Sequence, residues 1–310
     1  MKPFALPEKT VTPLRFTCHV AQEAIMAKDV AGLQIVEAGH VTRLKWHRLR
    51  RSLADPEFAA VVMAEGFKIG ASMELDLQVR GDGGFVVLHD PTLDRETTGT
   101  GAVALHTGAQ LSALRYRSQD AGLILSEDLA GLLTLAHPDA LLQFDMKNTF
   151  EEVGPTGLAH FAAQFSNLRA NIILSGGSIP LIRALAEQSP LIQRGYDPTD
   201  DLLEIWPVHG LGGVERALIA VLRDQIKPDM VYLQWEMVLS AADLGLDMVS
   251  LAHAEGVKID AWTHRMQNPS DGFTPAEGED FAKLLALKPD QITTDEPIAT
   301  EAAWSAWRAL

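Results

Sequence analysis

The chain has 310 residues, and 26 basic against 41 acidic side chains give it a formal net charge of −15. This balance argues against broad nucleic-acid binding and against docking on an anionic membrane, because both partners attract basic surfaces. A hydrophobic fraction of 47% and one cysteine, Cys18, indicate a globular protein without an internal disulfide, as in a reducing compartment.

The first 40 residues are interpreted as an N-terminal extension, in which residues 18–29 are expected to form a helix. This extension is expected to cap the floor of the fold or to take part in oligomer contacts. It lacks the apolar run behind a basic end that marks a secretory signal. No uninterrupted apolar stretch of about 18 residues follows, so no membrane span is expected, and the predicted location is the cytoplasm.

Short apolar runs then alternate with amphipathic segments. Strands are predicted at residues 42–47, 72–79, 141–147, 171–175, 191–196, 230–235, 257–263 and 291–294. Helices are predicted between most of them, among others at 179–188, 214–224, 241–255 and 275–286. No glycine-rich phosphate loop follows the first strand, so the pattern predicts an α/β fold, a (β/α)8 TIM barrel, rather than a doubly wound sheet. We expect one barrel domain over residues 41–310.

A long connection, residues 80–138, separates the second and third predicted strands. It opens with the turn formers Gly81, Asp82, Gly83 and Gly84, after which residues 85–89 run back as the second arm of a hairpin. The connection is therefore expected to be an inserted hairpin and subdomain that rises from the barrel rim and returns to it.

Two acidic residues of the second strand, Glu74 and Asp76, are two positions apart and so share one face, while Leu75 and Leu77 share the other. In a barrel the acidic face points inward, where two enclosed carboxylates require a positive partner such as a hard divalent cation. The alternative is an edge strand with its acids in solvent.

The third strand repeats this alternation, with Asp145 and Lys147 on one face near its C-terminal end. Barrel enzymes place their chemistry at that end. Asp145 is predicted to complete a three-carboxylate cation site with Glu74 and Asp76, and Lys147 to meet an anionic substrate. A purely structural Lys–Asp pair is the alternative.

Two of the ten histidines are predicted to lie at the same rim. His47 ends the first strand, and His89 ends the returning arm of the hairpin. Arg43 and Lys45 share the inward face of the first strand with His47, and acids of the second strand are expected to balance them. For most of the others a surface or helix-packing role is the interpretation; these are His106, His137, His160, His209 and His253.

These residues resemble the glycerophosphodiester phosphodiesterase family, and the similarity runs from about residue 47 to residue 297. The family pattern is His-Arg-Gly, Pro-Glu-Asn, Glu-x-Asp, a turn with His-Asp, and acid-x-Lys. The chain carries, in that order, His47-Arg48, Pro56-Glu57, Glu74-Leu75-Asp76, His89-Asp90 and Asp145-Met146-Lys147, followed later by Trp262-Thr263 and Thr294-Asp295 with Pro297.

The chain also departs from the family pattern. Leu49 replaces the glycine of His-Arg-Gly, Phe58 replaces the asparagine of Pro-Glu-Asn, and Asp145 stands where the family usually has Glu. His264 and Arg265 follow Trp262-Thr263 in place of an apolar residue and Asn. Since the acid–base and metal positions are retained, these departures bear on the substrate more than on the chemistry.

The resemblance implies hydrolysis of a glycerophosphodiester to glycerol 3-phosphate and an alcohol, with Mg²⁺ or Ca²⁺ held by the acidic triad Glu74, Asp76 and Asp145. His47 and His89 are the expected acid–base pair, without an assignment of which is acid and which is base. The expected substrate-binding residues are Arg48, Lys147, Trp262 and Glu57. Trp262 has the alternative role of a core aromatic, and Glu57 that of an acid at a helix N-terminus.

Three functions remain open at this point. The first is a metal-dependent glycerophosphodiesterase. The second is a related phosphodiesterase for another headgroup, such as a lysophospholipid or a sugar phosphodiester, suggested by Leu49, Phe58 and His264. The third is a non-catalytic binder of phosphate metabolites. The expected partner is a small phosphodiester and no nucleic acid; the oligomeric state stays open, with a homo-oligomer among the alternatives.

Overall fold

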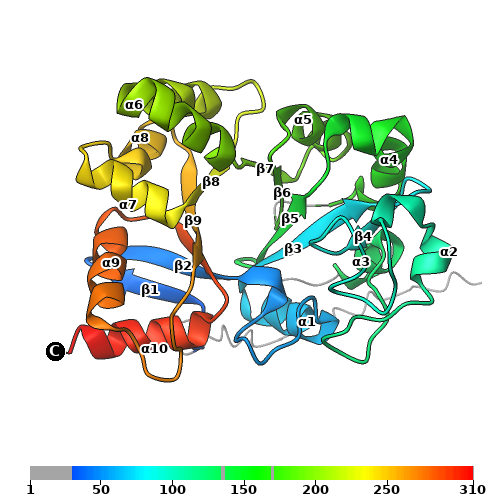
Figure 1. Cartoon of the computed structure of the whole chain (residues 1–310), viewed down its shortest axis with the longest axis horizontal. Coiled ribbons are helices and arrows are strands. Elements are labelled where there is room, and N and C mark those ends of the chain that lie inside the picture. Colours follow the sequence, from blue (N-terminus) through cyan, green and yellow to red (C-terminus); the bar gives the residue numbers. More distant parts are fainter. Residues whose placement is uncertain (1–29, 134–136, 169–170, 310) are drawn as a thin grey trace, which may run out of the picture.

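Eight parallel strands close into a barrel that occupies the centre of the computed structural model (Figure 1). The model describes residues 30–133, 137–168 and 171–309, so the helix expected at 18–29 lies outside the described residues. The barrel closes because β2 pairs with both β10 and β3. The predicted (β/α)8 barrel is confirmed. Its strands are β2 (His40–Trp46), β3 (Ser72–Val79), β5 (Leu141–Met146), β6 (Ile172–Gly176), β7 (Gln193–Tyr196), β8 (Met230–Gln234), β9 (Lys258–His264) and β10 (Gln291–Thr294).

One further strand, β1 (Gln34–Glu37), was not predicted and lies within the expected N-terminal extension. It pairs antiparallel with β2 on the outside of the barrel, with Gln34 opposite Arg43. Only four residues long, it shows too little alternation between polar and apolar residues to be recognised from sequence.

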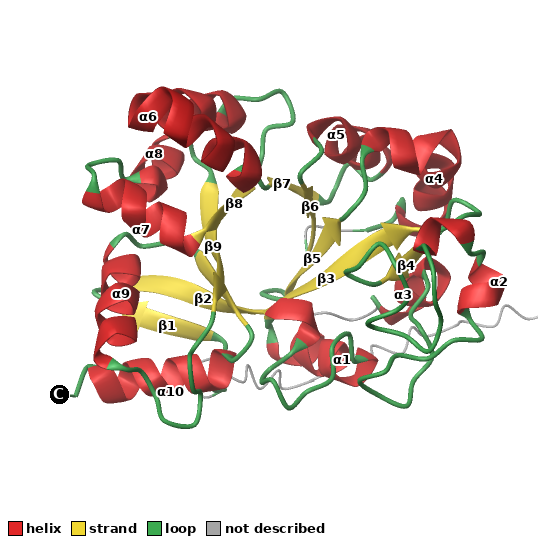
Figure 2. Ribbon diagram, in the orientation of Figure 1, coloured by secondary structure: helices red, strands yellow, loops and turns green. Residues whose placement is uncertain are grey.

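Helices surround the barrel (Figure 2). They are α1 (Ala60–Ile69), α2 (Gly108–Leu111), α3 (Ser126–Leu132), α4 (Phe150–Phe165), α5 (Ile179–Gln188), α6 (Thr199–Leu222), α7 (Trp235–Asp243), α8 (Met248–Ala254), α9 (Pro275–Ala286) and α10 (Pro297–Trp307). The helices predicted at 179–188 and 275–286 form with those bounds, whereas 214–224 covers only the second half of α6.

The single helix predicted at 241–255 is wrong. Gly245 has a φ of +97° and ends the regular segment, and Asp247 then starts α8 by accepting a 2.9 Å hydrogen bond from the backbone N–H of Ser250. A glycine in this conformation and an Asp N-cap are the ordinary signals for a helix end and a new start. α7 and α8 therefore meet at a bend of 97°.

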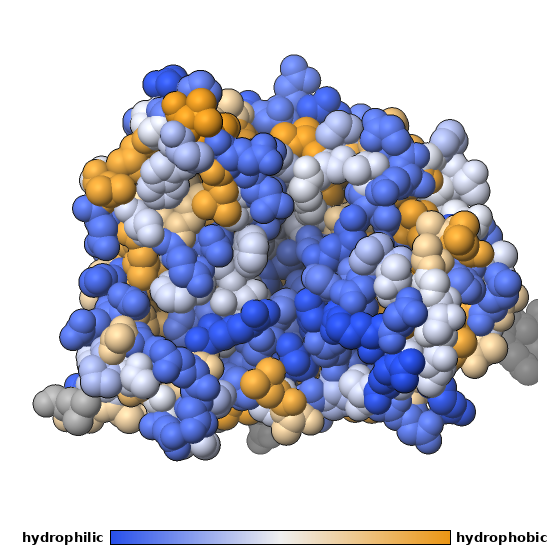
Figure 3. Space-filling view, viewed as in Figure 1, coloured by the Kyte–Doolittle hydropathy of each residue, from blue (hydrophilic) through white to orange (hydrophobic). Residues whose placement is uncertain are grey.

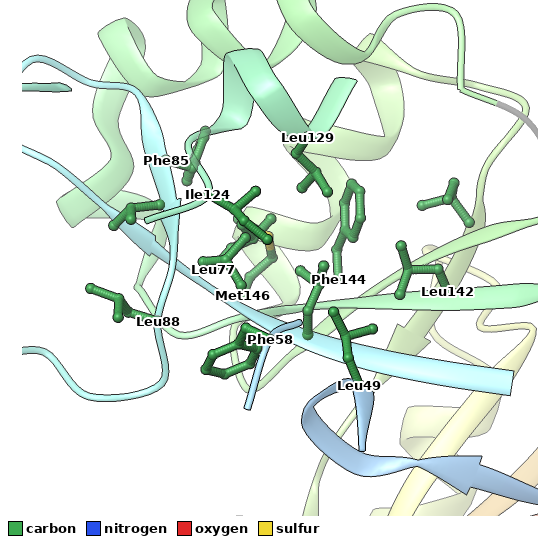
Figure 4. Packing of buried hydrophobic residues seen from close by; sticks show 14 of the residues in the cluster. Leu49, Phe58, Leu77, Phe85, Leu88, Ile124, Leu129, Leu142, Phe144 and Met146 are labelled. Carbon is green, nitrogen blue, oxygen red and sulfur yellow. The ribbon is translucent and has the colours of Figure 1, made fainter. Parts of the chain in front are cut away.

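The predicted insertion begins with the hairpin of β3 and β4 (Phe85–Val87). The turn closes through hydrogen bonds of 2.9 Å from Arg80 N to Gly84 O and from Gly83 N to Arg80 O. Apolar side chains from the insertion then pack on the outward faces of β3 and β5, which fixes the segment that carries His89 (Figure 4). The labelled members of this cluster are Leu49, Phe58, Leu77, Phe85, Leu88, Ile124, Leu129, Leu142, Phe144 and Met146.

A buried ion pair crosses the barrel interior. Lys45 of β2 lies 2.8 Å from Asp260 of β9, and the two side chains are 2% and 0% exposed. Lys45 also donates to Gln143, and Thr293 donates to Asp260 at 2.6 Å. The inward direction of Lys45 agrees with its strand parity, but the expected partner was wrong, because β9 rather than the second barrel strand supplies the acid.

By length and composition, one helix of the described part of the chain, α6, is apolar enough to cross a membrane, and α7 with α8 would make a second only as one bent span. Leu202, Val214 and Leu218 of α6 are instead buried in a cluster with β8 and β9. In the apolar window of α6 as a whole 22% is buried, so the burial of these three side chains accounts for only part of its apolar character.

Candidate active site

A cavity of about 250 Å³ opens at the C-terminal ends of the barrel strands. Figure 3 shows a hollow at the centre of the molecular face, surrounded by hydrophilic residues. The cavity is lined by Lys45, His47, Arg48, Glu74, Asp76, His89, Gln143, Asp145, Lys147, Asp197, Tyr232, Trp262, Thr263, Arg265 and Thr293. All predicted site residues except Glu57 are in this lining.

The acidic triad consists of Glu74 and Asp76 on β3 and Asp145 on β5. Asp76 and Asp145 are directly opposite each other in the parallel ladder. One carboxylate oxygen from each of the three residues lies within 4.8 Å of the others. Three convergent carboxylates are a donor set suited to a hard divalent cation.

The electrostatics of the triad reflect its enclosure. Burial, and then the charges of Asp76 and Asp145, raise the pKa of Glu74 well above its ordinary value. Burial would also raise the pKa of Asp76, but Lys147, His89 and Arg48 lower it overall. Asp76 Oδ2 is buried and accepts no hydrogen bond from the described residues. A cation at this point would satisfy that oxygen and offset the repulsion, so the residues fit the implied metal.

Two basic side chains contact the triad. Lys147 Nζ lies 2.8 Å from Asp76 Oδ1 and also pairs with Asp145. The backbone N–H of Arg48 donates to Glu74 at 2.8 Å, and its guanidinium lies 3.5 Å from Asp76. Arg48 has a φ of +51° in the turn that follows β2, and this conformation turns its amide toward Glu74.

His47 is held by an acid at the end of the last strand. Its Nδ1 lies 2.7 Å from Asp295, which also pairs with Arg50 and lies 3.0 Å from Arg265. Burial would raise the pKa of Asp295, but hydrogen bonding and charge from His47, Arg50 and Arg265 hold it well below its usual range. Burial lowers the pKa of His47, and Asp295 only partly opposes this shift.

His89 has a similar arrangement on the other side of the rim. Its Nδ1 lies 2.8 Å from Asp90, and Arg95 donates to both oxygens of Asp90 at 2.6 and 2.7 Å. Arg95 first and then His89 keep the pKa of Asp90 far below its ordinary value. Glu96 fixes the backbone here, since its carboxylate accepts the N–H groups of His89 and Asp90 at 3.1 and 2.9 Å.

Glu57 and Trp262 occupy different positions relative to the cavity. Glu57 accepts a 2.9 Å hydrogen bond from Arg48, and α1 begins three residues later, at Ala60, so Glu57 lies outside the helix rather than in its first turn. Trp262 lines the cavity and also packs against the small cluster of Met230 and Tyr232. Its two predicted roles, pocket wall and core aromatic, are thus combined.

Four functional candidates were missed or given no role in the sequence interpretation. Asp90 and Asp295 were noted only as part of the family resemblance, and Asp197 and Tyr232 were not noted at all. Asp197 directly follows β7, so its place at a barrel strand end was a usable signal. Its carboxylate accepts the Thr199 N–H at 2.9 Å, and burial raises its pKa to about 7.

Three of the residues that differ from the family pattern do not line the cavity. Leu49 and Phe58 are buried in the core, each with a φ of +59°, and His264 is buried among aromatic rings. None of these three side chains therefore contributes directly to the cavity wall. Of the departures near Trp262, only Arg265 lines the cavity.

Known proteins show a consistent similarity to this chain. Residues 60–156 match the model of the glycerophosphoryl diester phosphodiesterase family. A glycerophosphodiester phosphodiesterase of Caldanaerobacter subterraneus is 38% identical over 77 residues, which are 24% of this chain and 30% of that relative. This sequence match therefore spans less than a third of the relative's length.

Solved structures are similar over most of the chain. A putative glycerophosphoryl diester phosphodiesterase from Agrobacterium tumefaciens has a TM-score of 0.61 at 20% identity, covering 87% of this chain and 99% of that one. An Oleispira antarctica phosphodiesterase, solved with the product sn-glycerol-3-phosphate, has a TM-score of 0.57 at 18% identity, covering 84% and 96%. The resemblance to the glycerophosphodiester phosphodiesterase family is thus confirmed, in sequence over residues 60–156 and in fold over most of the chain.

Proposed function

We propose that this protein is a divalent-cation-dependent hydrolase that cleaves glycerophosphodiesters to glycerol 3-phosphate and an alcohol. The observation that carries the proposal is the meeting of three kinds of group in one cavity. These groups are the acidic triad, two histidines that each have a carboxylate at Nδ1, and the cations Arg48 and Lys147. The family match and the product named for the Oleispira structure support the same substrate class.

Glu74, Asp76 and Asp145 would hold the cation, Mg²⁺ or Ca²⁺. When bound, it supplies Lewis acidity that neutralises the charge developing on the phosphoryl group. Lys147 and Arg48 border the same site and add positive charge on the protein side. Arg48 offers a planar guanidinium suited to two phosphate oxygens, and Glu57 orients it through the 2.9 Å hydrogen bond.

His47 and His89 would transfer the protons. In each ring the carboxylate partner occupies Nδ1, which leaves Nε2 as the nitrogen for proton exchange with the substrate. One ring removes a proton from the nucleophile, and the other gives one to the leaving alkoxide. Either water or the glycerol 2-hydroxyl fits as the nucleophile, the latter through a cyclic phosphate. Trp262 is proposed to wall the pocket beside the glycerol carbons.

The two other candidate functions have less support. A different headgroup was suggested by Leu49, Phe58 and His264, and none of these lines the cavity. A binder without catalysis has no need for two His–Asp pairs beside an acidic triad. We further propose that residues 41–310 act as one barrel domain, and that the protein works in the cytoplasm on small diesters, not on nucleic acid.

The test is release of glycerol 3-phosphate from a panel of glycerophosphodiesters, with Mg²⁺ and Ca²⁺ compared. His47→Ala and His89→Ala should each lower kcat/KM by about 10²–10⁴-fold. His253→Ala is the matched control, since His253 forms a 2.8 Å pair with Asp290 outside the cavity. Full activity in either cavity variant would refute the acid–base assignment.

A further inference from the structure

A second cavity, of about 300 Å³, lies on the floor of the barrel, at the N-terminal ends of the strands. Its lining includes Arg43 of β2, Leu141 at the start of β5, Gln193 at the start of β7 and Lys258 at the start of β9. The active cavity opens at the other end of the barrel, and the two cavities have no lining residue in common. The proposed reaction therefore makes no use of this floor cavity.

The two cations of the floor cavity, Arg43 and Lys258, come from different strands that face the same interior. Arg43 shares a strand face with Lys45, and Lys258 shares one with Asp260, because alternate residues of a strand point the same way. Lys45 and Asp260 form the buried ion pair inside the barrel. Arg43 and Lys258 therefore project toward the barrel axis on the floor side of that pair.

Arg43 has an unusual environment for an arginine. It is only partly exposed, yet it forms no ion pair in the described part of the chain, where the other arginines and lysines without a carboxylate partner are all exposed. Its side chain donates one hydrogen bond to a described residue, from Nη2 to the carbonyl oxygen of Gly70 at 2.6 Å. Burial lowers the pKa of Arg43, and the charge of Asp139 only partly opposes this shift. An enclosed cation that the protein does not balance favours an anion from outside.

Asp139 is the only acid among the described residues of the lining. Its carboxylate is 71% exposed and lies 3.7 Å from Nδ1 of His137, so it is in solvent rather than on the guanidinium of Arg43. With Arg43, Lys258 and Asp139 counted together, the lining keeps a net positive charge in a chain whose formal net charge is −15. This local excess of positive charge is the second feature that points to an anion.

We propose that the floor cavity binds a small phosphate group, with Arg43 contacting two of its oxygens and Lys258 supplying a second positive charge. A guanidinium is a planar fork that matches two phosphate oxygens, and an ammonium acts as a point charge. Gln34, directly opposite Arg43 in the ladder of β1 and β2, adds a neutral amide to the lining. A phosphate dianion matches two cations better than a single carboxylate does. The inference is independent of the proposed function, because the two cavities lie at opposite ends of the barrel.

The test is calorimetric titration of the full chain with inorganic phosphate, at a pH where phosphate is a dianion and with ionic strength held constant by sodium chloride. Arg43→Gln should weaken phosphate binding about tenfold, since it removes a charge-assisted pair of hydrogen bonds. Lys258→Gln, at an exposed lysine, should weaken it about two- to threefold. Asp139→Asn should strengthen it about twofold, because it removes a charge of the same sign as the ligand.

Arg216→Gln is the matched control, since Arg216 is an exposed arginine of α6 that also forms no ion pair with a described residue. It should bind phosphate as the wild-type protein does. The active cavity is unchanged in all of these variants, so phosphate bound there contributes equally to each titration. Differences between the variants therefore report on the floor cavity.

Two results would overturn the inference: no phosphate binding by the wild-type protein, or affinities of Arg43→Gln and Lys258→Gln equal to that of Arg216→Gln. If circular dichroism shows that Arg43→Gln does not fold, Lys258→Gln and Asp139→Asn decide, because the inference requires their affinities to shift in opposite directions. Any other result for that pair would refute it. None of these measurements follows hydrolysis, so failure of this inference is distinguishable from failure of the proposed function.

Discussion

The carboxylate of Asp295, which binds His47, is surrounded by more charged groups than the carboxylate of Asp90, which binds His89. Arg50 and Arg265 share Asp295 with the imidazole, and their charges keep its carboxylate ionised. An ionised Asp at Nδ1 fixes the tautomer of His47 and stabilises its protonated form. Asp295 is therefore a positioning residue for the reaction.

Replacing Asp295 tests this role. Asp295→Asn should lower kcat on the order of 10²-fold, because His47 loses both its orientation and its counter-charge. Since the carboxylate raises the pKa of His47, its removal should move the limb of the pH–rate profile that belongs to His47 to lower pH. Asp290→Asn, at the His253 pair outside the cavity, should change neither quantity. An unchanged profile in Asp295→Asn would contradict the positioning role.

The proposed metal site can be tested by replacing Asp145, one of its three carboxylates. Asp145→Asn removes one charge from the acidic triad and should weaken Mg²⁺ or Ca²⁺ binding at least about tenfold, as calorimetry would measure. Asp145→Glu restores the longer acid of the family pattern and should keep binding within a few-fold. If Asp145→Asn binds the cation as well as the wild-type protein, Asp145 is not a ligand.

Strand parity was enough to predict which residues meet at the rim, because alternate side chains of a strand share a face. The triad residues and Lys147 were found in this way, whereas the two histidines were found from their places at the end of the first strand and of the returning hairpin arm. The residues behind them were not, because Asp295 reaches His47 from a strand 248 positions away along the chain. Such contacts depend on how the barrel closes, which no local pattern contains.

The hairpin of β3 and β4 is the element that brings His89 back to the rim. Gly83 has a φ of +83° at its tip, and a Cβ there would come within 2.5 Å of Thr156 on α4. Gly83→Ala should therefore destabilise the protein by about 1–2 kcal/mol in urea unfolding. Gly177→Ala is the control, since a Cβ at that position meets nothing within 4 Å. Equal stability of the two variants would show that the turn tolerates a side chain.

Helix and strand predictions succeeded where the pattern was long and failed at short or bent elements. α5 and α9 formed with the predicted bounds, since Ser178 and Thr274 cap their first turns and Pro180 and Pro275 lie at their starts. The segment 241–255 is apolar enough for one helix, yet Gly245 and Asp247 divide it. Gly245 and Asp247 are both visible in the sequence as signals for a helix end and a helix start, but the prediction of a single helix followed the apolar periodicity instead.

The pH dependence of the whole molecule should carry a contribution from His264. This side chain is 2% exposed among Trp235, Phe273 and Phe281, and burial lowers its pKa to about 4. The unfolded chain takes up a proton near pH 6.5, whereas the folded protein does so only near pH 4. Stability should therefore fall as the pH drops through this window, by about 3 kcal/mol from this one group.

His264→Phe isolates that contribution, because it keeps an aromatic ring and removes the titration. The variant should lose less stability than the wild-type protein between pH 7 and pH 4.5 in thermal or urea unfolding. His209→Phe, on the exposed side of α6, should behave like the wild-type protein. Parallel stability curves for His264→Phe and wild type would rule out the contribution.

The buried pair of Lys45 and Asp260 joins β2 to β9 across the barrel interior. Lys45→Met should cost about 3–5 kcal/mol of unfolding free energy, because it leaves a buried carboxylate unpaired. The double variant Lys45→Met with Asp260→Leu should recover much of that loss. A single variant as stable as the double one would show that Asp260 finds another partner. The sequence predicted that Lys45 points inward, but it did not predict that β9 supplies the acidic partner.

Metal-dependent release of glycerol 3-phosphate by the wild-type protein tests the central claim most directly. The measurement follows product from one glycerophosphodiester before EDTA treatment, after it, and after Mg²⁺ or Ca²⁺ is restored, with Asp76→Asn carried through the same steps. The account predicts activity that EDTA abolishes and the cation restores in the wild-type protein, and none at any step in Asp76→Asn. Release that persists in EDTA, or in Asp76→Asn, would contradict it.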